Sequence, residues 1–120
     1  MLRIYARLLA AALLAMAVLA TIRIPNVGLG VSVLYGGSAA VFAYAGFRRG
    51  EAALVRSVVA AMGSLFLASG LLLALAIGVV GFPFEGRYWV VGLAHAALGG
   101  FTMACAVLLP CDDDGGPASR

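Results

Sequence analysis

Charged side chains are scarce in this sequence, and lysine is absent altogether. Only 11% of the 120 residues are charged, whereas 64% are hydrophobic and the mean hydropathy is +1.10. A soluble domain carries about 25% charged residues, so the polar surface here is too small to cover a water-soluble globule. This composition excludes a soluble enzyme, a coiled coil and a disordered chain, and it indicates a small integral membrane protein.

All eight basic residues are arginines, and they occur singly or in pairs between apolar runs. They therefore form no continuous face that could follow a phosphate backbone, which argues against a nucleic-acid partner. Arginines in such places act as topology determinants and contact anionic lipids.

Side chains that carry chemistry are equally few. The chain has no Cys-x-x-Cys pair, no Gly-rich phosphate loop, no hydrolytic nucleophile motif and no cluster of metal ligands, so we expect neither an enzyme nor a metal site. No carboxylate lies inside an apolar run, which argues against a proton-coupled exporter that depends on an embedded glutamate. We expect Cys105 and Cys111 to be inert thiols. Residues 111–120, with aspartates at 112–114, are predicted to form a flexible acidic tail.

Four apolar runs are long enough to cross a bilayer, at residues 4–22, 28–47, 57–82 and 88–109. A transmembrane helix needs about 20 mostly apolar residues. The runs also lack the period-two alternation of a membrane β-strand, so the expected fold class is all-α, because helices satisfy their own backbone polar groups in lipid.

The links between these runs are short, at residues 23–27, 48–56 and 83–87. Short links make consecutive helices antiparallel neighbours. We therefore predict one transmembrane domain over residues 1–110, built as an up-and-down four-helix bundle.

The arginines also predict the orientation of this bundle. Only Arg23 and Arg87 lie on one side, and the other six lie on the side of the termini and the middle link, at positions 3, 7, 48, 49, 56 and 120. Because arginine-rich segments stay in the cytoplasm, we expect both termini there and a multi-pass location in the cell membrane.

The first run has a second interpretation. Arg3 and Arg7 followed by an apolar core are typical of a signal peptide, with a cleavage site at 18–20. The length of the run favours a retained first helix. The orientation of the other helices is the same in either case.

Small residues four apart form stripes that let helix backbones approach closely in a membrane. Such stripes are typical of packing within a chain or against another subunit, and the third run carries two, at 60-64-68 and 70-74-78. We expect Gly100 to lie in a contact, where leucine would force the helices apart. The predicted packing residues are Gly28, Ser32, Gly36 and Ala40 in the second run and Gly92, Ala96, Gly100 and Ala104 in the fourth.

His95 is the only histidine, and it lies inside the fourth run. Ionisable residues at membrane depth are costly to bury and are functional candidates. The simplest interpretation is a structural hydrogen bond to Thr102, Ser64, Ser69 or a carbonyl group. The alternatives are a ligand or proton role, or a single axial ligand to haem or a chlorophyll-type pigment, with the nearby glycines making room for the macrocycle.

The second half of the chain carries Arg56, Gly63 and Gly70, followed by Trp89, His95 and Gly99 in the last run. In this layout it resembles a family of uncharacterised small four-helix bacterial membrane proteins, classed only as a domain of unknown function. That family usually has a further histidine in its second helix, where this chain has Tyr35 and two glycines. The resemblance implies a four-helix membrane fold and no activity.

These observations favour a non-catalytic accessory or structural subunit that packs against other membrane helices. Its expected partners are membrane lipids and other transmembrane helices, as a homo-oligomer or in a larger complex. A small transporter or channel-like protein is the first alternative, and it would use the polar groups Ser32, Ser38, Ser64, Ser69, Thr102 and His95. The second alternative is a haem- or pigment-bearing component of an electron-transfer or light-harvesting complex.

Overall fold

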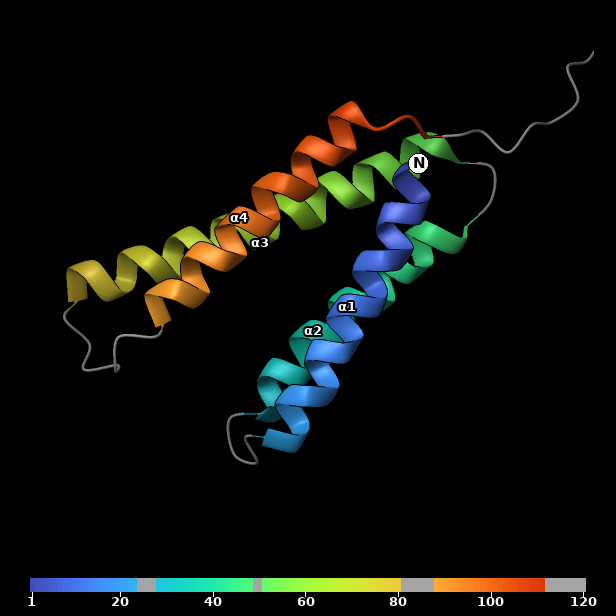
Figure 1. The fold of residues 1–120 in the computed structure, drawn as a ribbon. Coiled ribbons are helices and arrows are strands. Elements are labelled where there is room, and N and C mark those ends of the chain that lie inside the picture. Colours follow the sequence, from blue (N-terminus) through green and yellow to red (C-terminus); the bar gives the residue numbers. More distant parts are fainter. Residues whose placement is uncertain (24–27, 49–50, 81–87, 112–120) are drawn as a thin grey trace, which may run out of the picture. The chain divides into compact units, whose positions relative to one another are not determined.

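The computed structural model describes residues 1–23, 28–48, 51–80 and 88–111, and all regular structure in these segments is helical (Figure 1). The side chains of 23, 28–31, 76–80 and 88 lie outside this description. The predicted all-α fold is therefore confirmed for the described residues. The helices are α1 (Leu2–Arg23), α2 (Gly28–Phe47), α3 (Ala52–Val80) and α4 (Tyr88–Leu108).

The helix bounds follow the predicted runs closely, with one exception. Helix α3 begins at Ala52, whereas the sequence interpretation placed residues up to Arg56 in a link. Alanine and leucine are strong helix formers, and the amide of Val55 donates to the carbonyl of Glu51 at 3.1 Å, which starts the helical ladder. The single charge of Arg56 does not end the helix, because its long side chain can reach polar surroundings.

Three of the helices are long and apolar enough to cross a membrane, over Leu2–Ile22, Ala52–Leu75 and Trp89–Leu108. The described apolar part of α2, Ser32–Phe47, is shorter than these three. A multi-span helical architecture therefore agrees with the structure, and the fourth span stays a prediction.

The chain divides into two compact units. The first consists of Met1–Val58 and Leu109–Arg120, and the second consists of Val59–Leu108. The first unit contains α1, α2 and the start of α3, and the second contains the rest of α3 together with α4. The bundle of all four helices and the orientation of the termini stay predictions.

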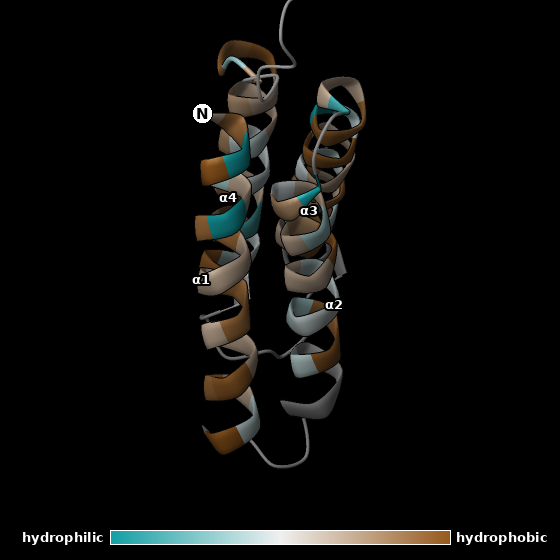
Figure 2. Ribbon diagram, turned by 90° about the vertical axis from the view of Figure 1, so that its right-hand side faces the viewer, coloured by the Kyte–Doolittle hydropathy of each residue, from teal (hydrophilic) through white to brown (hydrophobic). Residues whose placement is uncertain are grey.

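In the first unit, α1 and α2 form an antiparallel pair, which we call the first hairpin (Figure 1). The buried apolar residues of α1 recur at spacings of three and four, which is typical of one packed helix face. Phe42 is the largest fully buried side chain of this unit. Figure 2 shows hydrophilic residues in the first turns of α1, near the amino terminus. The buried apolar residues of α1 are Leu2, Ala6, Leu9, Ala10, Leu13 and Ala17.

In the second unit, α3 and α4 run side by side as the second hairpin (Figure 1). Phe66, Ala96, Cys105 and Ala106 are buried there. Between them lie glycines at which the two backbones approach each other most closely.

Candidate functional site

Four glycines form the contact between the helices of the second hairpin. A Cβ atom built on Gly63 would lie 3.0 Å from the carbonyl oxygen of Gly99, and one on Gly92 would lie 2.9 Å from that of Gly70. Gly99 and Gly70 meet the same opposite backbone segments in return. The two pairs, Gly63 with Gly99 and Gly70 with Gly92, therefore let α3 and α4 touch backbone to backbone.

Each helix places its two contact glycines seven residues apart. Seven residues correspond to two turns of helices that wind around each other, at 3.5 residues per turn. The sequence interpretation did not find this pattern, although Gly63–Gly70 and Gly92–Gly99 carry the signal.

The predicted stripe on α4 differs from this contact face in its second half. Gly92 and Ala96 are buried in it, as expected. A Cβ on Gly100 would meet no atom within 4 Å, however, and Ala104 is exposed. Steps of four residues advance about 40° around the axis each time, so a strict four-residue stripe leaves the contact after one or two turns. Gly99 takes the place that was assigned to Gly100.

Only part of the predicted stripe on α2 contacts α1. The hydroxyl of Ser32 donates to the carbonyl of Ala17 at 3.0 Å and lies 2.7 Å from the hydroxyl of Thr21, so this position contacts α1. A Cβ on Gly36 would meet nothing within 4 Å, and Ala40 is exposed. The surroundings of Gly28 lie outside the described residues.

Of the two stripes predicted on α3, several residues contact α4 and one lies outside the described side chains. Ser64 donates to the carbonyl of Ala60 at 3.0 Å and lies 3.5 Å from the sulfur of Met103 on α4. Gly70 and Ala74 both face α4, where Gly92 approaches them. The surroundings of Gly78 lie outside the described side chains.

His95 contacts both its own helix and α3. Its Nδ1 atom lies 2.7 Å from the carbonyl oxygen of Val91, and its ring stacks on Phe66 with centroids 5.8 Å apart. The carbonyl partner agrees with one of the predicted possibilities. The other named candidates were Thr102, Ser69 and Ser64, and each donates to a backbone carbonyl of its own helix, at 2.7 Å, 3.1 Å and 3.0 Å.

Groups of three or more side chains suited to a metal ion do not occur among the described residues. Cys105 is buried and Cys111 is half-buried, and both are free thiols. The aspartates at 112–114 lie outside the described residues.

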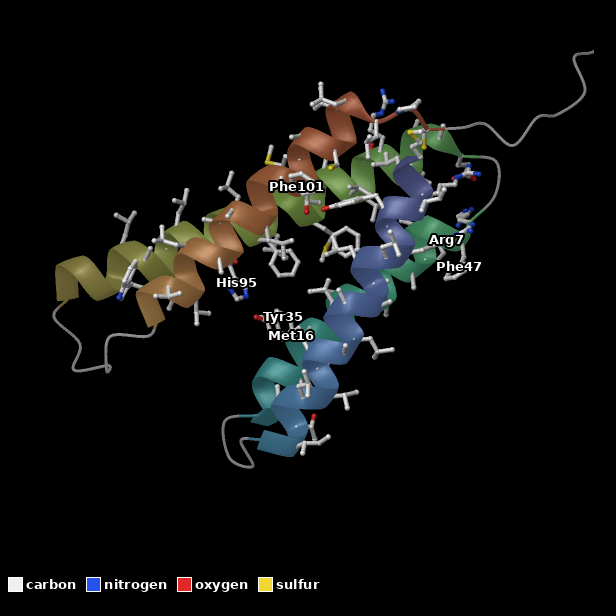
Figure 3. The ribbon with its side chains drawn as sticks, viewed as in Figure 1. Arg7, Met16, Tyr35, Phe47, His95 and Phe101 are labelled. Atoms are coloured by element: carbon white, nitrogen blue, oxygen red, sulfur yellow. The ribbon has the colours of Figure 1, made fainter. Side chains whose placement is uncertain are left out.

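One end of the first unit gathers arginines. Arg7 donates from Nε to the carbonyl of Gly46 at 2.7 Å, and its guanidinium lies over the ring of Phe47 at 4.7 Å. Figure 3 shows Arg7 and Phe47 together at one end of the first hairpin. Arg3, one helical turn before Arg7, is buried.

Two further arginines lie where α2 ends and α3 begins. Arg48 pairs with Glu51 at 3.2 Å and lies over Tyr44, and Arg56 donates to the carbonyl of Leu109 at 3.5 Å. The amide of Leu2 also donates to the carbonyl of Pro110, at 3.2 Å. The start of α1 and the chain after α4 therefore meet at this cationic end.

Comparisons of the chain with protein-family models, with curated proteins and with solved structures find no match. The resemblance to the four-helix family of unknown function accordingly stays a prediction, and the function has to be argued from the residues themselves.

Proposed function

We propose that the chain is a non-catalytic accessory or structural subunit of the cell membrane that packs against other transmembrane helices. The supporting observation is the small share of each span that the chain covers by itself. Only 28%, 22% and 28% of the apolar stretches of α1, α3 and α4, respectively, are buried. Large apolar side chains such as Leu8, Leu72 and Val107 are mostly exposed, so lipid or partner helices must cover them.

The polar groups of the spans support a structural role. Ser64, Ser69 and Thr102 each donate to a carbonyl of their own helix, and His95 contacts the carbonyl of Val91. A hydroxyl that bonds a carbonyl in the preceding turn of its own helix is satisfied inside lipid. This arrangement supports packing rather than a polar pathway or a catalytic centre.

In the proposed topology both termini are cytoplasmic and the four helices cross the membrane up and down. The cationic end supports this orientation, because Arg3, Arg7, Arg48 and Arg56 belong to the unit that holds the amino terminus and the chain after α4. Arginines near helix ends are retained on the cytoplasmic side.

Two experiments test the proposal. A reporter active only in the cytoplasm should work after Arg120, and one active only outside should work after Glu85; the opposite pattern would overturn the topology. For the accessory role, the tagged protein is extracted in mild detergent at native expression and sized. We expect a species larger than one chain, and a lone monomer that retains no other membrane protein contradicts the role.

A further inference from the structure

An open groove runs along the first hairpin between α1 and α2. It has a volume of about 370 Å³, which lies within the range of about 300–1,000 Å³ for ligand pockets in proteins. Most of its lining residues are alanine or glycine, and the larger ones are Arg7, Phe47 and Leu14. The small wall residues are Ala10, Ala11, Gly36, Ala39, Ala40 and Ala43.

The hairpin is fixed on both sides of this groove. Near one end, Arg7 bonds the carbonyl of Gly46, where a Cβ would already approach Arg7 Cγ to 2.8 Å. Near the other end, Ser32 bonds Ala17 on the opposite helix. Between these two points a Cβ on Gly36 would meet nothing within 4 Å. Between these two points the groove lies along an open side of the helix pair, while Leu13, Ala39 and Phe42 are buried in the hairpin at the same level.

The dimensions of the groove match one leaflet of a bilayer. From Phe47 to Gly36 the helical rise amounts to about 16 Å. The hydrocarbon core is about 30 Å thick, so one leaflet measures about 15 Å. In the proposed topology, a groove of this length extends from the cationic end to about the middle of the membrane. An apolar space in lipid stays dry and takes up an apolar occupant.

Arg7 is suited to hold a headgroup at the mouth of this groove. Its side chain is exposed, and Nε is bound to Gly46 while Phe47 supports the guanidinium plane. The other four N–H donors of a guanidinium belong to its two terminal nitrogens, and those of Arg7 make no hydrogen bond among the described residues. Such a fork pairs with two phosphate oxygens at once.

We propose that this groove is a binding site for one phospholipid with a negatively charged headgroup. One acyl chain lies between α1 and α2, and the phosphate pairs with Arg7. A negative headgroup suits this end because, among the described residues there, the arginines at positions 3, 7, 48 and 56 outnumber Glu51. A covering helix would instead bury the guanidinium of Arg7 away from an opposite charge, which is costly in a membrane. The site does not depend on the accessory role proposed above.

Native mass spectrometry of the full chain in mild detergent tests the site. The probes are a phosphatidylglycerol and a phosphatidylcholine with the same acyl chains. We expect one tightly retained phosphatidylglycerol per chain. Arg7→Gln should weaken its binding about tenfold and abolish the preference over phosphatidylcholine, since loss of about 1.4 kcal/mol is a factor of ten.

A second pair of variants separates the groove from the charge. Gly36→Leu and Ala40→Leu fill the groove without touching Arg7, so they should weaken both lipids and leave the preference in place. The matched controls are Arg48→Gln, an arginine of the same end outside the groove, and Ala12→Leu, an exposed alanine of α1 outside it. Both controls should bind lipid like the parent, and circular dichroism shows whether each variant is folded.

Three outcomes would overturn the proposal. If Arg48→Gln weakens binding as much as Arg7→Gln, the effect is one of general charge. If both groove-filling variants bind lipid like the parent, no acyl chain occupies the groove. If they change the oligomeric size instead, a second copy of the chain covers it. Should Arg7→Gln fail to fold, the two groove-filling variants carry the test alone, because Gly36 and Ala40 have space around them.

Discussion

The two hairpins use small residues in different ways. In the second hairpin, Gly63 and Gly70 meet Gly99 and Gly92, and the two backbones touch. In the first hairpin, only Gly46 lies against the opposite backbone among the glycines of α2 with described side chains, and a Cβ on Gly36 or Gly37 would meet nothing within 4 Å. Buried apolar residues, together with the bonds of Arg7 and Ser32, hold the helices together. A small residue permits a close approach but does not cause one. The spacing of the small residues along both helices decides whether the backbones meet.

This difference matters because membrane helices gain little from burying apolar surface against each other. Their association rests on close packing and on interhelical hydrogen bonds of about 0.6 kcal/mol each. The second hairpin relies mainly on close packing and has one interhelical hydroxyl contact, from Ser64 to the sulfur of Met103. In the first hairpin, Arg7 and Ser32 bond carbonyls of the opposite helix, and the groove along this hairpin can hold a ligand.

The largest effect is expected from a leucine in the glycine contact of the second hairpin. A Cβ on Gly99 would lie 2.6 Å from the carbonyl oxygen of Gly63, on rigid backbone. Gly99→Leu should therefore lower the melting temperature in mild detergent, with a loss near the upper end of the about 1–3 kcal/mol range for overpacking. Gly100→Leu adds the same atoms one residue later, where nothing lies within 4 Å, and should melt like the parent. If Gly100→Leu is the less stable variant, the contact face is assigned wrongly.

A smaller loss is expected at the closed end of the first hairpin. A Cβ on Gly46 would lie 2.8 Å from Arg7 Cγ, which can move, and 3.2 Å from the carbonyl oxygen of Arg3, which is backbone. Gly46→Leu should cost about 1 kcal/mol. Gly37→Leu is the matched control in the same helix, outside the groove, where a Cβ would meet nothing within 4 Å, and it should keep the parent's melting temperature. Equal losses at both positions would show that the hairpin has no open part.

The hydroxyl contact of the first hairpin should contribute still less. Thr21 and Ser32 lie 2.7 Å apart across the two helices. We expect Thr21→Ala and Ser32→Ala to be coupled by about 0.6 kcal/mol, the average for interhelical hydrogen bonds in membranes. A double-mutant cycle on the unfolding free energy measures this coupling. Additive losses would mean that the two hydroxyls do not hold the hairpin.

The smallest effect on stability is expected at His95. Its Nδ1 contact is within α4 and its ring lies on Phe66, so His95→Ala removes no backbone contact between the helices and should cost less than Gly99→Leu. The absorption spectrum of the purified parent adds a second test. A band beyond the aromatic one that is lost in His95→Ala would show a haem or pigment and would replace the structural interpretation of this residue.

The sequence was sufficient for most of the helix bounds. Helix α2 covers the predicted residues 28–47, and α4 ends at Leu108, one residue before the predicted end. Continuous apolar runs bounded by proline and arginine leave few alternatives to a helix in lipid. The start of α3 was missed because a charge was interpreted as a link, although the residues before Arg56 favour a helix.

The candidate packing residues were predicted less well. The four-residue stripe includes Gly92 and Ala96, which lie in the contact, but it continues to Gly100 and Ala104, which do not. The groove beside Gly36 and Ala40 had no counterpart in the sequence interpretation, because a stripe of small residues is the same pattern whether a helix or a space lies beside it.

The sequence by itself determined that this protein is helical and apolar enough for a membrane. Composition and the lengths of apolar runs are properties of the chain alone and do not depend on tertiary contacts. The tertiary structure decided which glycines touch and where a groove opens. Those outcomes depend on how two helices wind around each other, and on contacts such as Arg7 with Gly46 and Ser32 with Ala17 that join residues far apart in the chain. A shift of one residue, from Gly100 to Gly99, changes the face of α4 that contacts α3. The sequence of one helix does not specify which of its faces meets the neighbouring helix.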